Sequence, residues 1–185
     1  MTTQQVLSAQ TYDFDLAHSS ADFSVKHLMI ATVRGRMAIK SGHVEVDLQD
    51  VQKTRVVAEI DAASIHTGDE KRDGHLRSGD FLNAEAHPTL NFESTRVERV
   101  DANKYRVEGN LTIRGTTRPI TLDVDHEGEA KDPWGNKHIA LVGRTTLDRT
   151  QWGLSWNAAL ETGGVLVGEK VKVEINVELV ERKAS

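Results

Sequence analysis

The chain carries eight histidines, and imidazole is well suited to binding metal ions and moving protons near neutral pH. They occupy positions 18, 27, 43, 66, 75, 87, 126 and 138. No two have the His-x-x-x-His or strand His-x-His spacing of common metal sites. The sequence has no cysteine, which excludes thiolate metal ligands, disulfides and cysteine nucleophiles. We therefore predict no metal and no cofactor, and expect these rings to hydrogen-bond to nearby carboxylates and backbone groups.

Nucleophilic catalysis is the second chemistry to consider, because it needs a serine or threonine beside a base that a third group orients. His18 and Ser19 are adjacent, but neighbours on an extended strand point to opposite faces. The chain has no Gly-x-Ser-x-Gly elbow, no phosphate-binding glycine loop and no dinucleotide fingerprint. The sequence therefore predicts a protein that is not an enzyme.

The elements that position these side chains show a period of two. From Val171 to Leu179 every odd position is apolar, and the even positions from Lys170 to Glu178 are charged or are Asn176. This alternation is typical of a β-strand with one buried face and one exposed face. The same pattern predicts strands over residues 12–16, 21–27, 33–39, 44–48, 56–60, 90–92, 105–113, 120–124, 139–147 and 169–179.

Two places interrupt the alternation before residue 80. The apolar parity changes at Ser41-Gly42, which predicts a bulge or turn at Gly42. Thr67 or Asp69 can cap a short helix that runs to about Ser78 and has acidic residues in its first turn.

A third interruption covers residues 151–164, where a helical turn is expected near 157–161. Trp152 and Trp156 lie four residues apart in this segment and share a face if it is helical. They then either stack on a ligand or seal one end of the fold. Trp134, in a turn sequence, is expected to be exposed or half-buried.

The size and charge of the chain restrict its class. Its 185 residues suit one domain, 1–185, with residues 1–9 as a flexible tail. The 23 basic and 28 acidic residues are mixed, and no basic tract suggests a nucleic-acid partner. The N-terminus lacks the features of a secretory signal, and no apolar run is long enough to span a bilayer. We expect a cytoplasmic protein, or a periplasmic one if a leader has been removed.

An all-β chain with many half-buried antiparallel strands must close on itself or stack on a second sheet. Eight to ten strands and one or two short helices predict an up-and-down barrel or a sandwich. An eight-stranded barrel encloses either packed side chains or one small ligand. Inward positions of modest size and an aromatic content of 5% favour an open axis, although patterning alone leaves both interiors possible.

Many residues outside the alternation resemble a known family. The stretches are DLAHS at 15–19, FSVKHL at 23–28, VRG at 33–35, SIHTG at 64–68, RDGHLRS at 72–78, DFL at 80–82, HP at 87–88, FES at 92–94, GNLTIRG at 109–115 and VGEKV at 167–171. From about residue 10 to 180, their order and spacing resemble those of the YceI-like family of bacterial lipid-binding proteins.

The resemblance implies a lipocalin-like, eight-stranded antiparallel barrel with a long apolar tunnel. Family members hold polyisoprenoid chains, isoprenoid quinones or other long amphiphiles there, and the family allows a homodimer. If the apolar face of each strand points into this tunnel, the residues on those faces are expected to line it. They are Phe14, Phe23, Val25, Met37, Val56, Ile60, Phe92, Leu111, Ile113, Val173 and Ile175, with Trp152 from the irregular segment.

The lipid headgroup is expected at the tunnel mouth, near His27, Arg72 and His75. His18, His27 and His75 all fall in family motifs and are expected to meet at one end of the barrel. Together they either bind a metal or, as we favour, fix the mouth by hydrogen bonds. Arg72 and Asp73 alternatively form a solvated or structural ion pair.

Three functions follow from these observations. We favour binding of a long-chain isoprenoid lipid without chemistry, for carriage, storage or sequestration. The alternatives are a small enzyme that acts on a lipid in the same cavity, and a structural protein with a filled barrel.

Overall fold

The computed structural model describes residues 9–183, so the tail predicted over residues 1–9 lies outside the described residues except for Ala9. The strands are β1 Gln10–Phe14, β2 Ser20–His27, β3 Ala31–Met37, β4 Ile39–Val46, β5 Arg55–Asp61, β6 Thr89–Asp101, β7 Lys104–Ile113, β8 Thr116–Lys131, β9 Lys137–Asp148 and β10 Val167–Glu181. The helix α1 spans Glu70–Arg77, and short 3₁₀ helices are η1 Leu16–His18, η2 Val51–Lys53, η3 Ala62–Ser64 and η4 Arg149–Trp152. Each predicted strand and the predicted helix overlaps an observed element, but the strand predicted over 33–39 is broken at Ala38, and Leu16 and Leu48 lie outside the strands.

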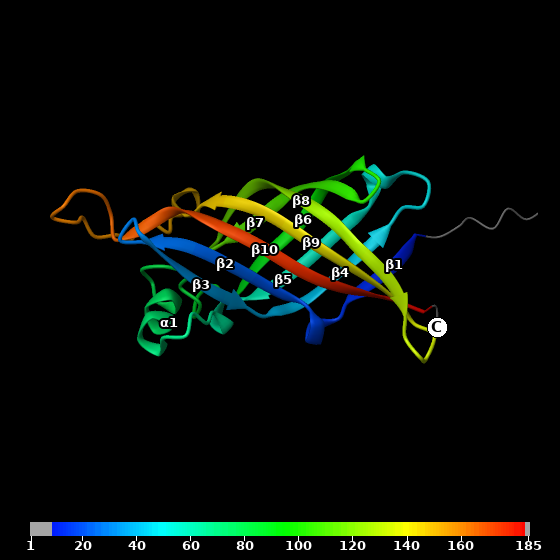
Figure 1. The fold of residues 1–185 in the computed structure, drawn as a ribbon, viewed down its shortest axis with the longest axis horizontal. Coiled ribbons are helices and arrows are strands. Elements are labelled where there is room, and N and C mark those ends of the chain that lie inside the picture. The colour runs from blue at the N-terminus through cyan, green and yellow to red at the C-terminus, as the bar shows by residue number, and fades with distance from the viewer. Residues whose placement is uncertain (1–8, 184–185) are drawn as a thin grey trace, which may run out of the picture.

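The strands form a closed antiparallel barrel (Figure 1). Its ring runs β1-β4-β5-β6-β7-β8-β9-β10 and closes where β10 pairs with β1, which gives the eight strands predicted. β2 follows β1 after η1 and pairs with β10, and β3 runs into β4 and pairs with β2. Each of these two pairs of short strands therefore acts as one long barrel strand with an interruption.

The interruption near Gly42 lies slightly earlier than predicted. The pairing of β4 with β5 shifts register between Ile39 and Ser41, so the bulge falls before Gly42. A Cβ at Gly42 would lie 2.5 Å from the ring of Phe14. Gly42 is therefore needed because an aromatic ring lies against its backbone, and the parity change comes from the adjacent bulge.

Two other glycines have the same relation to an inward-facing ring. A Cβ at Gly35 would lie 2.3 Å from the ring of Phe23, and one at Gly109 would lie 2.4 Å from the ring of Phe92. Real Cβ atoms do not approach so closely. The absence of a side chain at these positions lets the rings lie flat on the inner wall.

The helix begins where the sequence predicts it. Asp69 is its N-cap, and its side chain accepts a hydrogen bond from the backbone N–H of Arg72 at 2.8 Å. α1 lies at one end of the barrel, and the C-terminal end of β10 lies at the other (Figure 1). The fold thus has a long wall of strands and one end at which the irregular segments gather.

One prediction for the irregular regions is wrong. The helical turn expected near residues 157–161 is absent, and a 3₁₀ turn forms earlier, at Arg149–Trp152. Asp148 determines this position because its side chain accepts a hydrogen bond from the backbone N–H of Thr150 at 3.1 Å. Trp152 and Trp156 therefore share no helix. Trp134 is 80% exposed, as predicted.

Candidate functional site

A cavity of about 460 Å³ lies inside the barrel. Ligand pockets typically have volumes of about 300–1,000 Å³. All ten strands contribute to its lining, which runs from Tyr12 and Val46 near one end to Arg149 and Leu154 near the other. The lining is overwhelmingly apolar because the inward positions of the alternating strands are mostly Val, Ile, Leu and Phe. The interior is therefore hollow, and the arrangement can bury an elongated apolar ligand.

The structure brings all twelve expected tunnel residues together along this cavity. Those in the lining are Phe14, Phe23, Val25, Met37, Val56, Ile60, Phe92, Leu111, Ile113, Trp152, Val173 and Ile175. Each strand residue in this set is on the inward face that its parity predicted. Their contact with a lipid stays a prediction.

The three residues expected to meet a headgroup lie outside the cavity lining. His27 ends β2, where it pairs with Val167 and Ala31. The guanidinium of Arg72 donates to the hydroxyl of Thr67 at 2.7 Å and to its carbonyl at 2.9 Å. The ring of His75 hydrogen-bonds to Asp80 at 2.8 Å. Their role toward a headgroup also stays a prediction.

The expectation that His18, His27 and His75 meet at one end is wrong. His18 ends η1, just before β2, and His27 is the last residue of that eight-residue strand. A strand of this length spans roughly 26 Å, so it holds the two rings far apart. The motif positions carried no information on strand length, which decides this distance.

Asp73 and Arg72 do not form an ion pair with each other, because each forms hydrogen bonds with Thr67 instead. Asp73 is only 3% exposed and accepts hydrogen bonds from the backbone N–H of Thr67 at 2.9 Å and from its hydroxyl at 2.5 Å. Burial alone would raise the pKa of the Asp73 carboxyl, but the bonds from Thr67 and the nearby His66 outweigh it and hold that pKa below its ordinary value. This carboxylate fastens α1 to the segment that precedes it.

The end of the barrel beside α1 contains a cluster of rings. His75 lies edge-on to Phe81 and to Trp156, with ring centroids 5.1 and 4.6 Å away. Phe81 also lines the cavity, as do Leu76 and Leu82. Trp152 is 2% exposed and donates its indole N–H to the carbonyl of Leu111 at 3.0 Å. Side chains from α1 and from residues 149–156 therefore form this end of the cavity.

Sequence reasoning missed Arg149, a buried residue of the cavity lining. Its guanidinium donates to main-chain carbonyls of Leu154, Trp156, Val167 and Gly168, the last at 2.9 Å. Within residues 9–183 it forms no ion pair, and burial lowers its pKa against the opposing charges of Glu169 and Asp148.

One signal in the sequence does point to Arg149. It has the same parity as Leu147, an inward residue of β9. Its bonds join the segment after η4 to the start of β10. Arg149 therefore serves mainly to hold the irregular end of the barrel together.

None of the helices between residues 9 and 183 combines the length and apolar character needed to cross a bilayer.

Comparisons with known proteins agree with this architecture. The family model described as the YceI-like domain matches residues 12–179. The UPF0312 protein SA2479 of Staphylococcus aureus strain N315 is 38% identical over 168 residues, which cover 90% of this chain and 95% of that protein.

Solved structures of similar fold include three from different organisms. BcnA of Burkholderia cenocepacia has a TM-score of 0.75 at 21% identity, covering 90% of this chain and 99% of that one. The YceI protein of Campylobacter jejuni has a TM-score of 0.71 at 27% identity, covering 85% and 90%.

The third is a polyisoprenoid-binding domain from Saccharophagus degradans, implicated in plant cell wall breakdown. It has a TM-score of 0.65 at 15% identity and covers 92% of this chain and 98% of that one. The low identities to this domain and to BcnA show a shared fold, whereas the family match extends along nearly the whole barrel. The chain belongs to the YceI-like domain family.

Proposed function

We propose that the protein binds the hydrocarbon chain of a long-chain isoprenoid lipid inside the barrel and carries, stores or sequesters it without chemistry. The observation that supports this most is the apolar cavity to which all ten strands contribute. The similar fold of the polyisoprenoid-binding domain from Saccharophagus degradans adds support for the ligand class.

The driving force is burial of hydrocarbon. Each CH₂ group moved from water into an apolar environment contributes about 0.8 kcal/mol. An isoprenoid tail has many such groups, so the gain is large even after the cost of ordering a flexible chain is subtracted. Aromatic residues such as Phe23 and Phe92 supply wide, rigid surfaces along the wall for contact with this tail.

Binding without catalysis is supported by the few polar groups that face the cavity. Thr54 and Thr145 are the hydroxyl residues of the lining apart from its tyrosines. Among the described residues, neither threonine hydrogen-bonds to a histidine or a carboxylate, as an activated nucleophile would. No observation favours the alternative of an enzyme acting on a lipid in the same cavity. The headgroup, a homodimer and a cytoplasmic location stay predictions.

Lipid recovery from the purified full chain tests the proposal. Organic extraction followed by mass spectrometry is expected to yield an isoprenoid lipid in about stoichiometric amount, unmodified after long incubation. Val173→Trp places a large ring in the lining and is expected to abolish lipid recovery while the protein stays folded by circular dichroism. Val100→Trp is the matched control, because Val100 is 53% exposed on the outside.

Two results would overturn the proposal. One is a wild-type protein that contains no lipid and takes none up from vesicles containing a polyprenyl lipid. The other is equal lipid recovery from the Val173→Trp and Val100→Trp variants. If Val173→Trp does not fold, Ile175→Phe makes the same test with a smaller increase in volume.

A further inference from the structure

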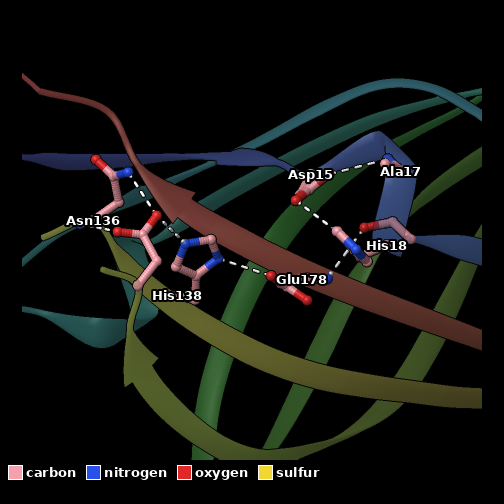
Figure 2. Close-up of polar contacts among 8 residues, drawn as sticks. Asp15, Ala17, His18, Asn136, His138 and Glu178 are labelled. Carbon is pink, nitrogen blue, oxygen red and sulfur yellow. Dashed lines mark hydrogen bonds and ion pairs between the residues drawn. The ribbon is translucent and has the colours of Figure 1, made fainter. Parts of the chain in front are cut away.

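Three side chains converge on the outside of the barrel where η1 separates β1 from β2 (Figure 2). Asp15 is the N-cap of η1, His18 is the last residue of η1, and Glu178 comes from the adjoining strand β10. One carboxylate oxygen of Asp15, one ring nitrogen of His18 and one carboxylate oxygen of Glu178 all lie within 4.8 Å of one another. This cluster is separate from the cavity.

The main chain holds the three residues in place. The backbone N–H of Asp15 donates to the carbonyl of Glu178 at 2.8 Å, and the backbone N–H of Glu178 donates to the hydroxyl of Ser19 at 3.1 Å. Asp15 Oδ1 accepts from the backbone N–H of Ala17 at 3.0 Å. These three hydrogen bonds hold the backbone of Asp15 and Glu178 and one oxygen of Asp15 in place.

The atoms that face one another across the cluster are of types that bind metal ions, and two of them form a hydrogen bond to each other. Asp15 Oδ2 lies 2.8 Å from Nδ1 of His18. Glu178 uses Oε1 to accept from Nδ1 of His138 at 2.7 Å, and no side chain within residues 9–183 hydrogen-bonds to its second carboxylate oxygen. Two carboxylates and one imidazole thus face one another at this site.

The carboxylate of Glu178 is also oriented by hydrogen bonds with residues outside the cluster. His138 joins it to Asp132, whose Oδ2 lies 3.1 Å from Nε2 of His138 (Figure 2 shows His138 between Asn136 and Glu178). Asp132 is held in turn by the side chain of Asn136 at 2.7 Å. Such outer partners fix the position of a metal-binding carboxylate and typically change metal affinity by about 10–100-fold.

We propose that Asp15, His18 and Glu178 bind a divalent first-row transition metal ion, for which Zn²⁺ is the representative, with water completing the coordination. Tetrahedral bonds of about 2.0–2.2 Å place ligand atoms about 3.3–3.6 Å apart, so small side-chain rotations that separate Asp15 from His18 would be needed to seat the ion. The imidazole nitrogen favours Zn²⁺ over Mg²⁺ and Ca²⁺, which prefer oxygen ligands alone.

A bound ion would stabilise the contact between two segments of the barrel that pair over a short length. Within residues 9–183, the ladder between β1 and β10 runs through Tyr12–Phe14 and Leu179–Glu181, and η1 then interrupts the pairing before β2 continues it. The ion would join η1 to β10 at this interruption. Because it binds the folded barrel and not the unfolded chain, it raises the apparent stability.

Calorimetric titration of the metal-free full chain with Zn²⁺ tests the proposal, alongside thermal unfolding with Zn²⁺ or Mg²⁺. We expect one saturable site per chain and a higher Tm with Zn²⁺ only. His18→Ala and Glu178→Gln are each expected to weaken Zn²⁺ binding at least about tenfold. His43→Ala is the matched control, since His43 faces Glu45 at 3.5 Å on the outside and belongs to no group of three such ligands within residues 9–183.

Absence of saturable Zn²⁺ binding would overturn the proposal, and so would equal affinity in the wild type and the His18→Ala variant. An equal Tm shift with Mg²⁺ would also contradict it. His18 is exposed, so its replacement leaves the core intact. Lipid recovery is expected to be unchanged in these variants, which keeps this test independent of the proposed function.

Discussion

The wall of the barrel and the end beside α1 place polar side chains differently. Along the wall, alternation turns charged residues to solvent and leaves the cavity to apolar ones. At the α1 end, Asp73 and Arg149 are buried and bind the main chain or Thr67. The wall therefore gives the space for a ligand, and buried hydrogen bonds give the irregular end its shape. Binding and stability should respond separately to changes in the two regions.

The largest expected effect is at the α1 end. Arg149→Met removes bonds to carbonyls from two segments and leaves these groups without partners. Since a buried unsatisfied group costs about 1–3 kcal/mol, we expect the free energy of unfolding to fall by about 3–5 kcal/mol in urea titrations. Arg144→Met, which breaks ion pairs with Asp125 and Glu174 on the outside, is expected to cost less than about 1 kcal/mol. Equal losses would contradict the structural role of Arg149.

The next largest loss of stability is expected for a substitution at a glycine in the wall of the barrel. A Cβ at Gly109 would lie 2.6 Å from the carbonyl oxygen of Glu93, which is backbone and cannot rotate away. Gly109→Ala is therefore expected to destabilise the protein by about 2–3 kcal/mol. At Gly143 the nearest atom to an added Cβ is 3.6 Å away, so Gly143→Ala should have little effect in the same chemical denaturation. An unchanged free energy of unfolding in Gly109→Ala would contradict the close packing described at this position.

The contribution of Asp73 to the stability of the α1 end depends on pH. Its folded-state pKa is lowered, so its contribution to stability is present above the ordinary carboxyl pKa and is lost as pH falls through the lowered value. Asp73→Asn is expected to cost about 2 kcal/mol at pH 7, because it weakens charge-assisted bonds from Thr67.

Urea titrations at several values between pH 7 and the acid limit measure this dependence. The gap between wild type and Asp73→Asn should narrow once the pH falls below the ordinary carboxyl value. A gap that stays constant through this interval would assign the acid sensitivity to other carboxylates. Asp80→Asn, at a carboxyl group that is half-exposed, provides a control with little expected change.

The smallest effect is expected for His75→Ala. The ring packs against Phe81 and Trp156 and lies outside the cavity lining. We expect a loss of about 1 kcal/mol in stability with lipid recovery unchanged. Loss of bound lipid from a folded His75→Ala protein would restore the predicted headgroup role and would weaken the division between wall and end.

The sequence predicts the wall well because the period of two is a local property of each strand. Val173 and Ile175 line the cavity because every second residue of β10 faces inward, and this needs no knowledge of distant residues. The cap at Asp69 was also readable, since a capping side chain acts within three residues.

The α1 end was not predictable in the same way because its contacts join residues far apart in sequence. Arg149 reaches Gly168, and Trp152 reaches Leu111. No local pattern reports such partners. The Asp15–His18–Glu178 cluster was missed for the same reason, since Glu178 comes from the last strand, and a search for short metal-binding spacings does not detect it.

A crystal structure of the full chain after incubation with a long-chain polyprenyl lipid tests the central claim most directly. We expect continuous density for an extended chain along the barrel axis, in contact with Phe23 and Val173. An axis closed by the protein's own side chains, with the lipid absent or bound only outside the barrel, would contradict the account.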